Sequence, residues 1–380
     1  MANTLTNLIP DAYAALDVVS RELTGAIPGV QRDASADRLA TNQTLRSAIT
    51  PANAAADYTP AMSVPSAADE VITNASITLS KNRAVGFSWT GEEAYAMDQG
   101  PGFLSIRQDQ IAQAFRTLTN EMENDLCDAI ALGASRAYGT AGTTPFASTL
   151  ADSAQARKIL DDNGAPSSGR SLVIDTSAGA ALRTLGQLTK ANEAGTAMTL
   201  RDGELLNLQG FSVRESAQIN NATAGTGASY DIDLVAGYDI GDTTLHVDTG
   251  TGTILAGDII TIGNHKYVVT SGFAGDGDGD ITIAAPGLVE AVADGADVTV
   301  NATSARNLAF SSDAVTLATR LPQFPREGDL AIDNEVITDP RTGISFDLRV
   351  YPGDGMVLYR VHALWGYTVN KPAHAAILLG

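Results

Sequence analysis

Hydrophobic and polar residues alternate most regularly near the C-terminal end of the chain, in residues 343–351 and again in 356–365. Alternation with a period of two is typical of strands that bury one face. The residues between the two runs, Pro352-Gly353-Asp354-Gly355, favour a turn, so the pattern predicts a β-hairpin with Tyr351 opposite Met356. This register pairs Val350 with Val357, Leu348 with Tyr359, Phe346 with Val361 and Asp347 with Arg360. Phe346, Leu348, Val361 and Trp365 are the expected core residues of this hairpin.

A second hairpin is predicted at residues 71–90, where two runs of strand-forming residues flank the polar segment 80–83. This segment lies between a polar arm and a helix, and not within a series of strands. We therefore expect it to project from the body of the protein, with Lys81 at its tip.

The clearest helical pattern covers residues 106–136. Apolar residues recur there at steps of three or four, at Ile111, Phe115, Leu118, Met122, Leu126 and Ile130. Ser105 and Gln108 have the spacing of a capping box at its start. At 1.5 Å per residue the helix would be roughly 45 Å long, which favours an elongated subunit over a compact one.

Residues 153–215 alternate between helical and extended patterns and predict a small α/β unit. The expected elements are helices at 153–163 and 178–190, a buried strand at 171–175 and an extended segment at 205–214. Residues 306–310 and a helix-like segment at 313–320 would resume this α/β unit further along the chain.

Residues 228–303 differ in character, because Thr, Val, Ile, Gly and Asp dominate and Gly-rich turns separate short alternating runs. The expected strands are 243–247, 259–262, 266–270, 281–283 and 298–300. These features predict a small β-barrel or sandwich that interrupts the α/β unit as an insertion.

The N-terminal region has little core of its own. Residues 11–23 predict a short amphipathic helix after Pro10, and residues 29–68 are polar, rich in Ala and interrupted by prolines. An extended arm is the favoured interpretation of 29–68, and a disordered N-terminus is the alternative.

Charge strengthens the separation of residues 228–303 from the remainder. They hold twelve acidic residues and one basic residue, a net charge of −11 out of −20 for the whole chain of 380 residues. So acidic a chain argues against a surface that grips nucleic acid. The single cysteine excludes an intramolecular disulfide, and we expect neither a signal peptide nor a membrane-spanning run.

Motifs for catalysis or cofactor binding are not found in the sequence, which has no G-x-x-x-x-G-K-[ST], no G-x-S-x-G and no H-E-x-x-H. The four histidines, His246, His265, His362 and His374, do not have the spacing of metal ligands. His362 is expected to be an ordinary surface or interface residue, and Cys127 a buried, unreactive thiol in the long helix. We therefore predict no catalytic residue, no cofactor and no metal site.

One acidic segment has a second interpretation. Asp276, Asp278 and Asp280 resemble the start of a calcium loop, but Ile281 and Gly287 stand where such a loop requires Gly and Glu. An acidic turn is the favoured interpretation, and a weak calcium site is the alternative.

The end of the chain resembles that of a known family. Leu364, Trp365, Val369, Asn370 and Pro372, followed by a small apolar tail, resemble the segment that closes many major capsid proteins of short-tailed phages with an inserted domain. The order of parts (arm, projecting hairpin, long helix, α/β unit, β insertion, α/β return, terminal hairpin) resembles the capsid fold named after phage Hong Kong 97. Residues 306–310, with Asp313-Ala314 and Arg320-Leu321-Pro322 beyond them, resemble the family's return from the insertion.

The resemblance implies an α+β fold of the Hong Kong 97 type with an inserted small β-barrel. Its parts would be an N-terminal arm (1–68), an E-loop hairpin (69–100), the spine helix and part of the P-domain (101–150), an A-domain (151–227), the inserted acidic β-rich domain (228–303), the A-domain return (304–325), and P-domain strands with the C-terminus (326–380). Some relatives form lysine–asparagine crosslinks in the region of Lys81, but a solvated side chain is expected here.

The resemblance also implies a major capsid protein that self-associates into hexamers and pentamers of an icosahedral shell. The shell would enclose phage double-stranded DNA without sequence-specific contacts, with the inserted domain outside. A scaffolding protein and a portal are the expected partners, a decoration protein is a further candidate, and no membrane is involved. The location would be the virion, after assembly in the host bacterial cytoplasm.

Two other interpretations stay open at this point. A cellular encapsulin-like compartment would share the fold and hold an enzyme cargo in place of DNA, and a neighbouring gene for a terminase or for a cargo enzyme would decide between them. A β-rich adhesin or binding module built on residues 228–303 is disfavoured by the long helix.

Overall fold

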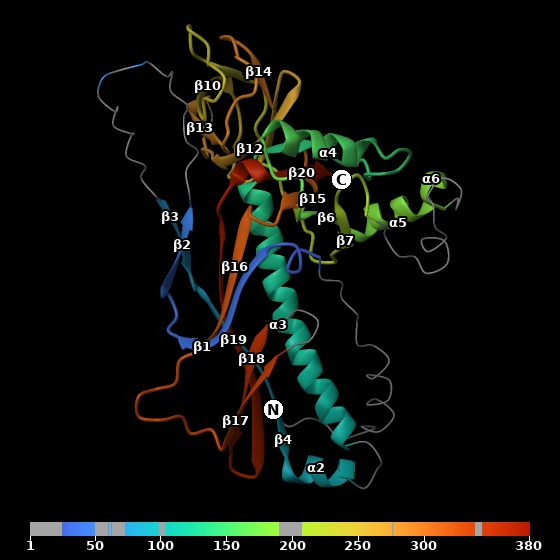
Figure 1. Ribbon diagram of the computed structural model, residues 1–380, viewed down its shortest axis with the longest axis vertical. Coiled ribbons are helices and arrows are strands. Elements are labelled where there is room, and N and C mark those ends of the chain that lie inside the picture. The colour runs from blue at the N-terminus through green and yellow to red at the C-terminus, as the bar shows by residue number, and fades with distance from the viewer. Residues whose placement is uncertain are drawn as a thin grey trace.

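The structure is a computed structural model that describes residues 25–49, 60, 62, 73–98, 103–189, 207–275, 277–338 and 344–380. The molecule is elongated, as Figure 1 shows, with a long helix and long strands running down the body and a group of short strands at one end. The helix predicted at 11–23 lies outside the described residues, and so does most of the segment 50–72. None of the described helices is both long enough and apolar enough to span a membrane.

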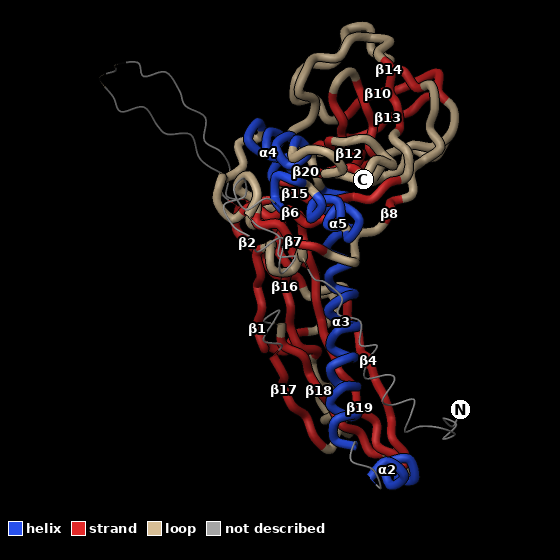
Figure 2. Tube along the Cα trace, turned by 90° about the vertical axis from the view of Figure 1, so that its right-hand side faces the viewer, coloured by secondary structure: helices blue, strands red, loops and turns tan. Residues whose placement is uncertain are grey.

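The long helix α3 is Phe103–Gly133, which confirms the helical prediction. Its 31 residues correspond to a length of about 46 Å. Leu118, Met122, Leu126 and Ile130 are fully buried, and Figure 2 shows the helix lying along one face of the long strands. Because α3 begins at Phe103, Ser105 lies inside it and is not its N-cap.

A true capping box lies one helix earlier. Helix α2 (Gly91–Asp98) follows Thr90, whose backbone N–H donates to Glu93 Oε2 at 2.9 Å, while the Glu93 N–H donates to Thr90 Oγ1 at 3.2 Å. These two bonds satisfy donors that the first turn of a helix leaves unpaired.

The long strands form a six-stranded sheet in the order β1-β16-β19-β18-β17, with β4 also paired to β19. Because its strands are long, this sheet is called the large sheet. The strands are β1 (Gln31–Leu39), β4 (Lys81–Thr90), β16 (Val315–Pro322), β17 (Asp333–Thr338), β18 (Ser345–Pro352) and β19 (Met356–Val369). Phe346, Val361 and Trp365, together with Leu348, are buried against α3, so the expected core of the terminal hairpin is confirmed. Phe346 stacks on Phe115 of the helix with ring centroids 4.9 Å apart.

The predicted register of the terminal hairpin is wrong by two residues. Val350 pairs with Tyr359, Leu348 with Val361 and Asp347 with His362. The turn closes through the Gly353 N–H, which donates to the Met356 carbonyl at 2.8 Å, so Pro352 already belongs to the strand and pairs with Val357. A shift of two keeps each side chain on its face, which is why the apolar pattern could not detect it. Asp347 therefore does not face Arg360.

The hairpin predicted at 71–90 is also wrong, because its two strands pair with other partners. β3 (Thr73–Thr78) pairs with β2 (Thr44–Ile49), whereas β4 pairs along ten residues with β19. Apolar residues around 77–87 explain these pairings, because they pack on the six-stranded sheet. Ile77 and Leu79 are buried with Ala318 and Leu364 of the large sheet, and Phe87 stacks on Tyr359 with centroids 5.2 Å apart.

Residues 313–320 are a strand and not the predicted helix. β16 is buried along its whole length and pairs antiparallel with β19 and parallel with β1. Its sequence V-T-L-A-T-R-L-P is rich in β-branched residues, which fit a strand covered on both faces.

The predicted α/β unit is a second layer at one end of the helix. Its sheet runs β5-β20-β15-β6-β7, and a short strand β8 also pairs with β15. The strands are β5 (Arg136–Tyr138), β6 (Arg170–Ile174), β7 (Ser212–Glu215), β8 (Asn221–Ala222), β15 (Ser304–Ser311) and β20 (Ala375–Leu379). Helix α4 (Ala151–Asp162) is close to its prediction, but the helix predicted at 178–190 is two helices, α5 (Thr176–Thr184) and α6 (Gly186–Thr189), separated at the extended residue Leu185.

The strands between residues 230 and 300 form a closed antiparallel ring. The order is β11-β14-β9-β10-β13-β12, and β12 pairs back with β11. The strands are β9 (Tyr230–Ile232), β10 (Thr244–Gly250), β11 (Ile259–Ile262), β12 (His265–Ser271), β13 (Gly277–Ile283) and β14 (Asp297–Val300). This ring, the barrel, encloses its own apolar cluster, which includes Tyr230, Ile260 and Val298. The five expected strands and the barrel alternative are confirmed, and only the three-residue β9 was missed.

The barrel is joined to the body at two places. The chain enters and leaves it through adjacent strands, since Ala222 of β8 pairs with Ser304 of β15. In addition, Tyr267 and Lys266 of β12 pair with Arg136 and Ala137 of β5, so the barrel strands continue hydrogen-bonded into the sheet of the α/β unit.

Candidate assembly surfaces

The start of the described chain is fixed to α3 by one buried carboxylate. Glu123 is fully buried, and its Oε1 accepts from the backbone N–H groups of Gly25 and Ala26, both at 2.6 Å, while Oε2 accepts from Ile27 at 2.9 Å. Hydrogen bonds to an ionised acceptor are stronger than neutral ones. The carboxylate thus determines where the N-terminal segment meets the body.

Close backbone packing fixes the same segment against the α/β sheet. A Cβ atom on Gly29 would lie 2.7 Å from Ser171 Oγ and 3.1 Å from the Phe310 ring, closer than side chains normally approach. Ile27 and Val30 are buried beside it. Only glycine fits at this point of close approach.

From Gln31 onward the segment is held by polar contacts and strand pairing instead of burial. Nearly every residue of β1 is exposed or only half-buried, although β1 pairs with β16 along its length. Arg320 links the two strands, because its guanidinium donates to the Asp33 backbone carbonyl at 2.6 Å and to Asp33 Oδ2 at 2.9 Å.

The far end of β1 is held by a buried acid, Asp347 of β18. Arg38 donates to its two carboxylate oxygens at 2.7 and 3.0 Å, Arg349 Nε at 2.7 Å and Asn334 Nδ2 at 3.0 Å. Burial alone would raise the pKa of Asp347, but the hydrogen bonds from Arg38 and Arg349 hold that pKa below its usual value. The acid therefore stays ionised and tethers the arm.

The two arginines also share one aromatic ring. The guanidinium carbon of Arg38 lies 3.8 Å, and that of Arg349 4.4 Å, from the centroid of the Phe324 ring. These cation–π contacts stabilise both guanidinium groups in addition to their ion pairs with Asp347. They thereby help to hold two positive charges close to one carboxylate.

A two-stranded ribbon leaves the large sheet next to this anchor. β2 and β3 pair along six residues and form a sheet of their own (Figure 1). The ribbon joins the body where β3 crosses β19, and a Cβ on Gly366 would lie only 2.2 Å from the Thr78 carbonyl oxygen. An isolated two-stranded ribbon is marginal in water, so it needs a further contact to be stable.

Large apolar side chains are exposed at several places on the described surface, among them the region of β17, the barrel loop between β9 and β10, and helix α2. Leu330 is 86% exposed and lies near Ile332 and Val336 beside the edge strand β17. Val235 is 91% exposed and lies with Ile240 in the barrel loop between β9 and β10, and Tyr95 is exposed on α2. Exposed apolar groups at an edge strand are the usual material of a contact between chains.

The residues considered for chemistry do not converge in the structure. Among the described residues, no group of three or more His, Cys, Asp or Glu side chains is placed to hold a metal ion. Cys127 is buried, and its pKa is raised by burial and then by Glu123 and Asp128. His362 is half-buried, and its pKa is lowered to about 4 by burial and by Arg349 and Arg360, so it is neutral at physiological pH.

The acidic segment of the barrel is a strand and not a loop. Asp278 and Asp280 lie in β13, and Asp276 is outside the described residues. Asp280 Oδ1 is 2.7 Å from His246 Nδ1, and Asp233 and Asp278 are each 4.0 Å from His246 Nε2. The hydrogen bond to Asp280, followed by the charges of these acids, raises the pKa of His246.

Lys81 is not at a projecting tip. It opens β4, and its Nζ lies 3.2 Å from Asp125 Oδ1 on α3, while Asp125 Oδ2 accepts from Trp365 Nε1 at 3.1 Å. Lys81 therefore binds the helix to the sheet.

Glu123 and Asp347 were not predicted to be anchors of the N-terminal segment. One signal was available for Glu123, since it follows Thr119 and precedes Cys127 at steps of four on the apolar stripe of α3. A charged residue on a buried stripe requires a partner. The pairing of Asp347 with Arg38 of the arm could not be found in the sequence, because the two residues are 309 positions apart.

Comparison with protein-family models and with curated proteins gives no match. Among solved structures, the capsid of the cyanophage P-SCSP1u matches with a TM-score of 0.51 and 12% identity, over 100% of this chain and 92% of that chain. A structure from Mycobacterium phage Che8 gives a TM-score of 0.48 and 15% identity over 89% and 84% of the two chains. The capsid of the native GTA particle gives 0.46 and 11% over 95% and 91%. The likeness to the cyanophage capsid shows that this chain has the fold of a phage capsid subunit.

Proposed function

We propose that this protein is a major capsid protein of a tailed phage, which self-associates into a closed shell around double-stranded DNA. The observation that carries the proposal is the likeness in fold to the P-SCSP1u capsid over the full length of the chain. The described surfaces support it, since β1 and the β2–β3 ribbon extend along and away from the body with little burial of their own. Such segments gain stability when neighbouring copies cover them.

The parts of the Hong Kong 97 fold can be assigned to this structure with three changes from the sequence-based boundaries. β16 moves from the A-domain return to the P-domain sheet, β20 moves from the P-domain to the A-domain sheet, and the E-loop is placed earlier in the chain. We assign α3 as the spine helix, the large sheet as the P-domain, and the sheet around β6 and β15 as the A-domain. The projecting E-loop is assigned to the β2–β3 ribbon, from Thr44 to Thr78, because β4 belongs to the P-domain sheet. The arm then runs through β1, anchored by Glu123 and Asp347.

The barrel fits an inserted domain on the outer face of the shell. Its entry and exit strands are neighbours, which is what an insertion into the A-domain requires. Its net charge of −11 would repel packaged DNA if it faced inward. In intact particles a protease or an antibody should reach the turn at Gly275; protection of this turn until the shell is broken would place the barrel inside.

An enzymatic role is the least supported alternative, because the described residues that could do chemistry are engaged in structural contacts. An encapsulin-like compartment would use the same kind of fold, but the full-length likeness is to a phage capsid. Scaffolding protein and portal are proposed partners, assembly in the host cytoplasm and residence in the virion are the proposed locations, and a decoration protein is a further candidate.

Sedimentation and electron microscopy of the protein, co-expressed with the products of its neighbouring genes, test the proposal. We expect hollow particles of megadalton mass that contain many copies of this chain. A protein that remains monomeric under every assembly condition would contradict the proposal, and particles that contain a co-purifying enzyme in place of DNA would favour the compartment alternative.

A further inference from the structure

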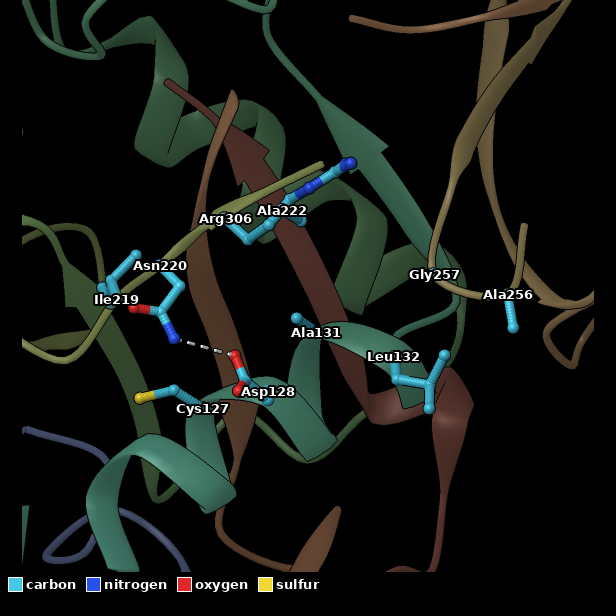
Figure 3. A pocket seen from close by; sticks show the side chains of 10 residues that line it. All are labelled: Cys127, Asp128, Ala131, Leu132, Ile219, Asn220, Ala222, Ala256, Gly257 and Arg306. Carbon is cyan, nitrogen blue, oxygen red and sulfur yellow. Dashed lines mark hydrogen bonds between the residues drawn. The ribbon is translucent and has the colours of Figure 1, made fainter. Parts of the chain in front are cut away.

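A cavity of about 240 Å³ lies where three parts of the molecule meet. Its walls come from the end of α3, from the chain leading into β8, and from the barrel loop before β11 (Figure 3). Asp128, Leu132, Asn220 and Ala256 are exposed at its rim, so the cavity is open to solvent. A space of this size accommodates a small molecule or one side chain and not a folded partner.

Arg306 of β15 forms the inner wall of this cavity. The residue is only 3% exposed, yet its Nε, Nη1 and Nη2 atoms have no hydrogen-bond partner among the described residues. In Figure 3 its side chain extends past Ala222 toward the side formed by Gly257. A buried arginine is normally paired, because removing an ionised guanidinium from water without compensation is costly.

The nearby acids do not give Arg306 a hydrogen bond. Asp258 acts on Arg306 electrostatically, but its carboxylate accepts from the backbone N–H groups of Gly225, at 2.9 and 3.2 Å, and of Leu255, at 2.7 Å. Asp128 lies on the opposite side and interacts with the amides of Asn124, at 3.4 Å, and Asn220, at 3.5 Å. The donors of Arg306 thus have no hydrogen-bond partner among the described residues, although the residue lines the cavity.

We propose that this cavity is a binding site for a small oxyanion, a carboxylate or a phosphate, held by the guanidinium of Arg306. The planar fork of arginine matches two oxygens of such a group. Ala131, Leu132, Ile219 and Ala222 add apolar surface to the lining, which lowers the local dielectric constant and so strengthens the attraction between the guanidinium and an anion. The proposal does not rest on the capsid role, because it follows from the subunit alone.

Thermal melting of the full-length, unassembled chain tests the site, with inorganic phosphate and acetate as probes against chloride at matched ionic strength. A ligand that binds the folded state raises the melting temperature with a saturating dependence on its concentration. We expect phosphate, acetate or both to raise it by about 2 °C or more at saturation. Arg306→Met, which keeps the length of the side chain, should remove this response. Arg326→Gln, a change at an exposed arginine, should keep it and so controls for general salt effects.

The same variants distinguish a ligand site from a structural arginine. In chloride, Arg306→Met should melt at the same temperature as the wild type or higher, because it removes an unpaired buried charge. Leu132→Trp should weaken the response by filling the rim, and Asp128→Asn should strengthen it by removing a negative charge from the rim. An equal anion response in the wild type and Arg306→Met would overturn the proposal. A lower melting temperature of Arg306→Met in chloride, without any anion response in the wild type, would overturn it as well.

Discussion

The barrel and the N-terminal segment through β1 are stabilised in opposite ways. The barrel closes its own ring of strands around a buried apolar cluster, so that its core and most of its strand pairing are internal, apart from the pairing of β12 with β5. Beyond Val30, β1 pairs with only one of the described strands, exposes most of its side chains and depends on Asp33–Arg320 and Arg38–Asp347 contacts with the body.

This difference separates what a subunit completes alone from what assembly must complete. A closed barrel leaves no sheet edge to be satisfied by another chain. An arm held by a few charged contacts is fixed in place and still presents most of its surface to a partner. The β2–β3 ribbon belongs with the arm in this respect, because in the described part of the chain each of its two strands pairs only with the other.

The largest expected effect is the difference between an isolated fragment that folds and one that does not. Residues 224–303 expressed alone should fold into a soluble monomer with a β-type circular dichroism spectrum and one cooperative unfolding transition, because the barrel core is internal. A peptide of residues 25–49 should show no regular structure. A barrel fragment that stays unfolded would mean that its pairing with β5 is essential.

Trp365→Ala should destabilise the body strongly. The ring is fully buried among residues of α3 and the large sheet, and the truncation should cost about 3–5 kcal/mol in the free energy of unfolding. Chemical denaturation of the full chain measures this cost, with Trp365→Phe as the milder control. The barrel should keep its own transition in the variant, and loss of both transitions together would contradict its independence.

Asp347→Asn should release the arm at smaller cost. It removes the charge between Arg38 and Arg349, and we expect a loss of about 3 kcal/mol and faster proteolysis near β1. Asp354→Asn, in the exposed hairpin turn, is the matched control. Because the folded-state pKa of Asp347 is lowered, its contribution is present above the unfolded value of about 3.9 and is lost only as the pH falls through the lower folded value. Arm release at mildly acidic pH would contradict this assignment.

The smallest expected effect lies on the barrel surface, at His246. Its pKa is raised, so its contribution to stability is fully present below the unfolded value of about 6.5 and is lost as the pH rises through the folded value. The barrel should therefore melt slightly higher at about pH 6 than at about pH 8.5, and His246→Gln or Asp280→Asn should each remove this difference. A pH response that survives in both variants would assign it to other groups.

Local elements could be predicted from the sequence where a single period was sustained. The apolar stripe of α3 and the short alternating runs of the barrel are clear for that reason. Pairing partners could not be predicted, because β4 binds a strand that begins 266 residues later and the hairpin register depends on one turn hydrogen bond. The segment 313–320 was predicted to be a helix because Val315, Ala318 and Leu321 also fit a helical period. Its burial on both faces, which only the structure shows, is what identifies it as a strand.

The anchors of the arm were predictable in part. Glu123 stands out as an acid on a buried stripe, but its partners are backbone N–H groups, which carry no sequence signal. Arg306 lies in a segment that was expected to resume the α/β unit, yet only the three-dimensional arrangement shows that its guanidinium lacks a hydrogen-bond partner among the described residues.

Hydrogen–deuterium exchange on free subunits and on assembled particles measures whether assembly completes the arm and the ribbon. We expect amides of β1, β2 and β3 to exchange at least about tenfold more slowly in particles, because neighbouring copies cover them, whereas amides of the barrel core should exchange equally in both states. Equal exchange of β1 and the ribbon in subunits and particles would contradict the claim that assembly completes these segments.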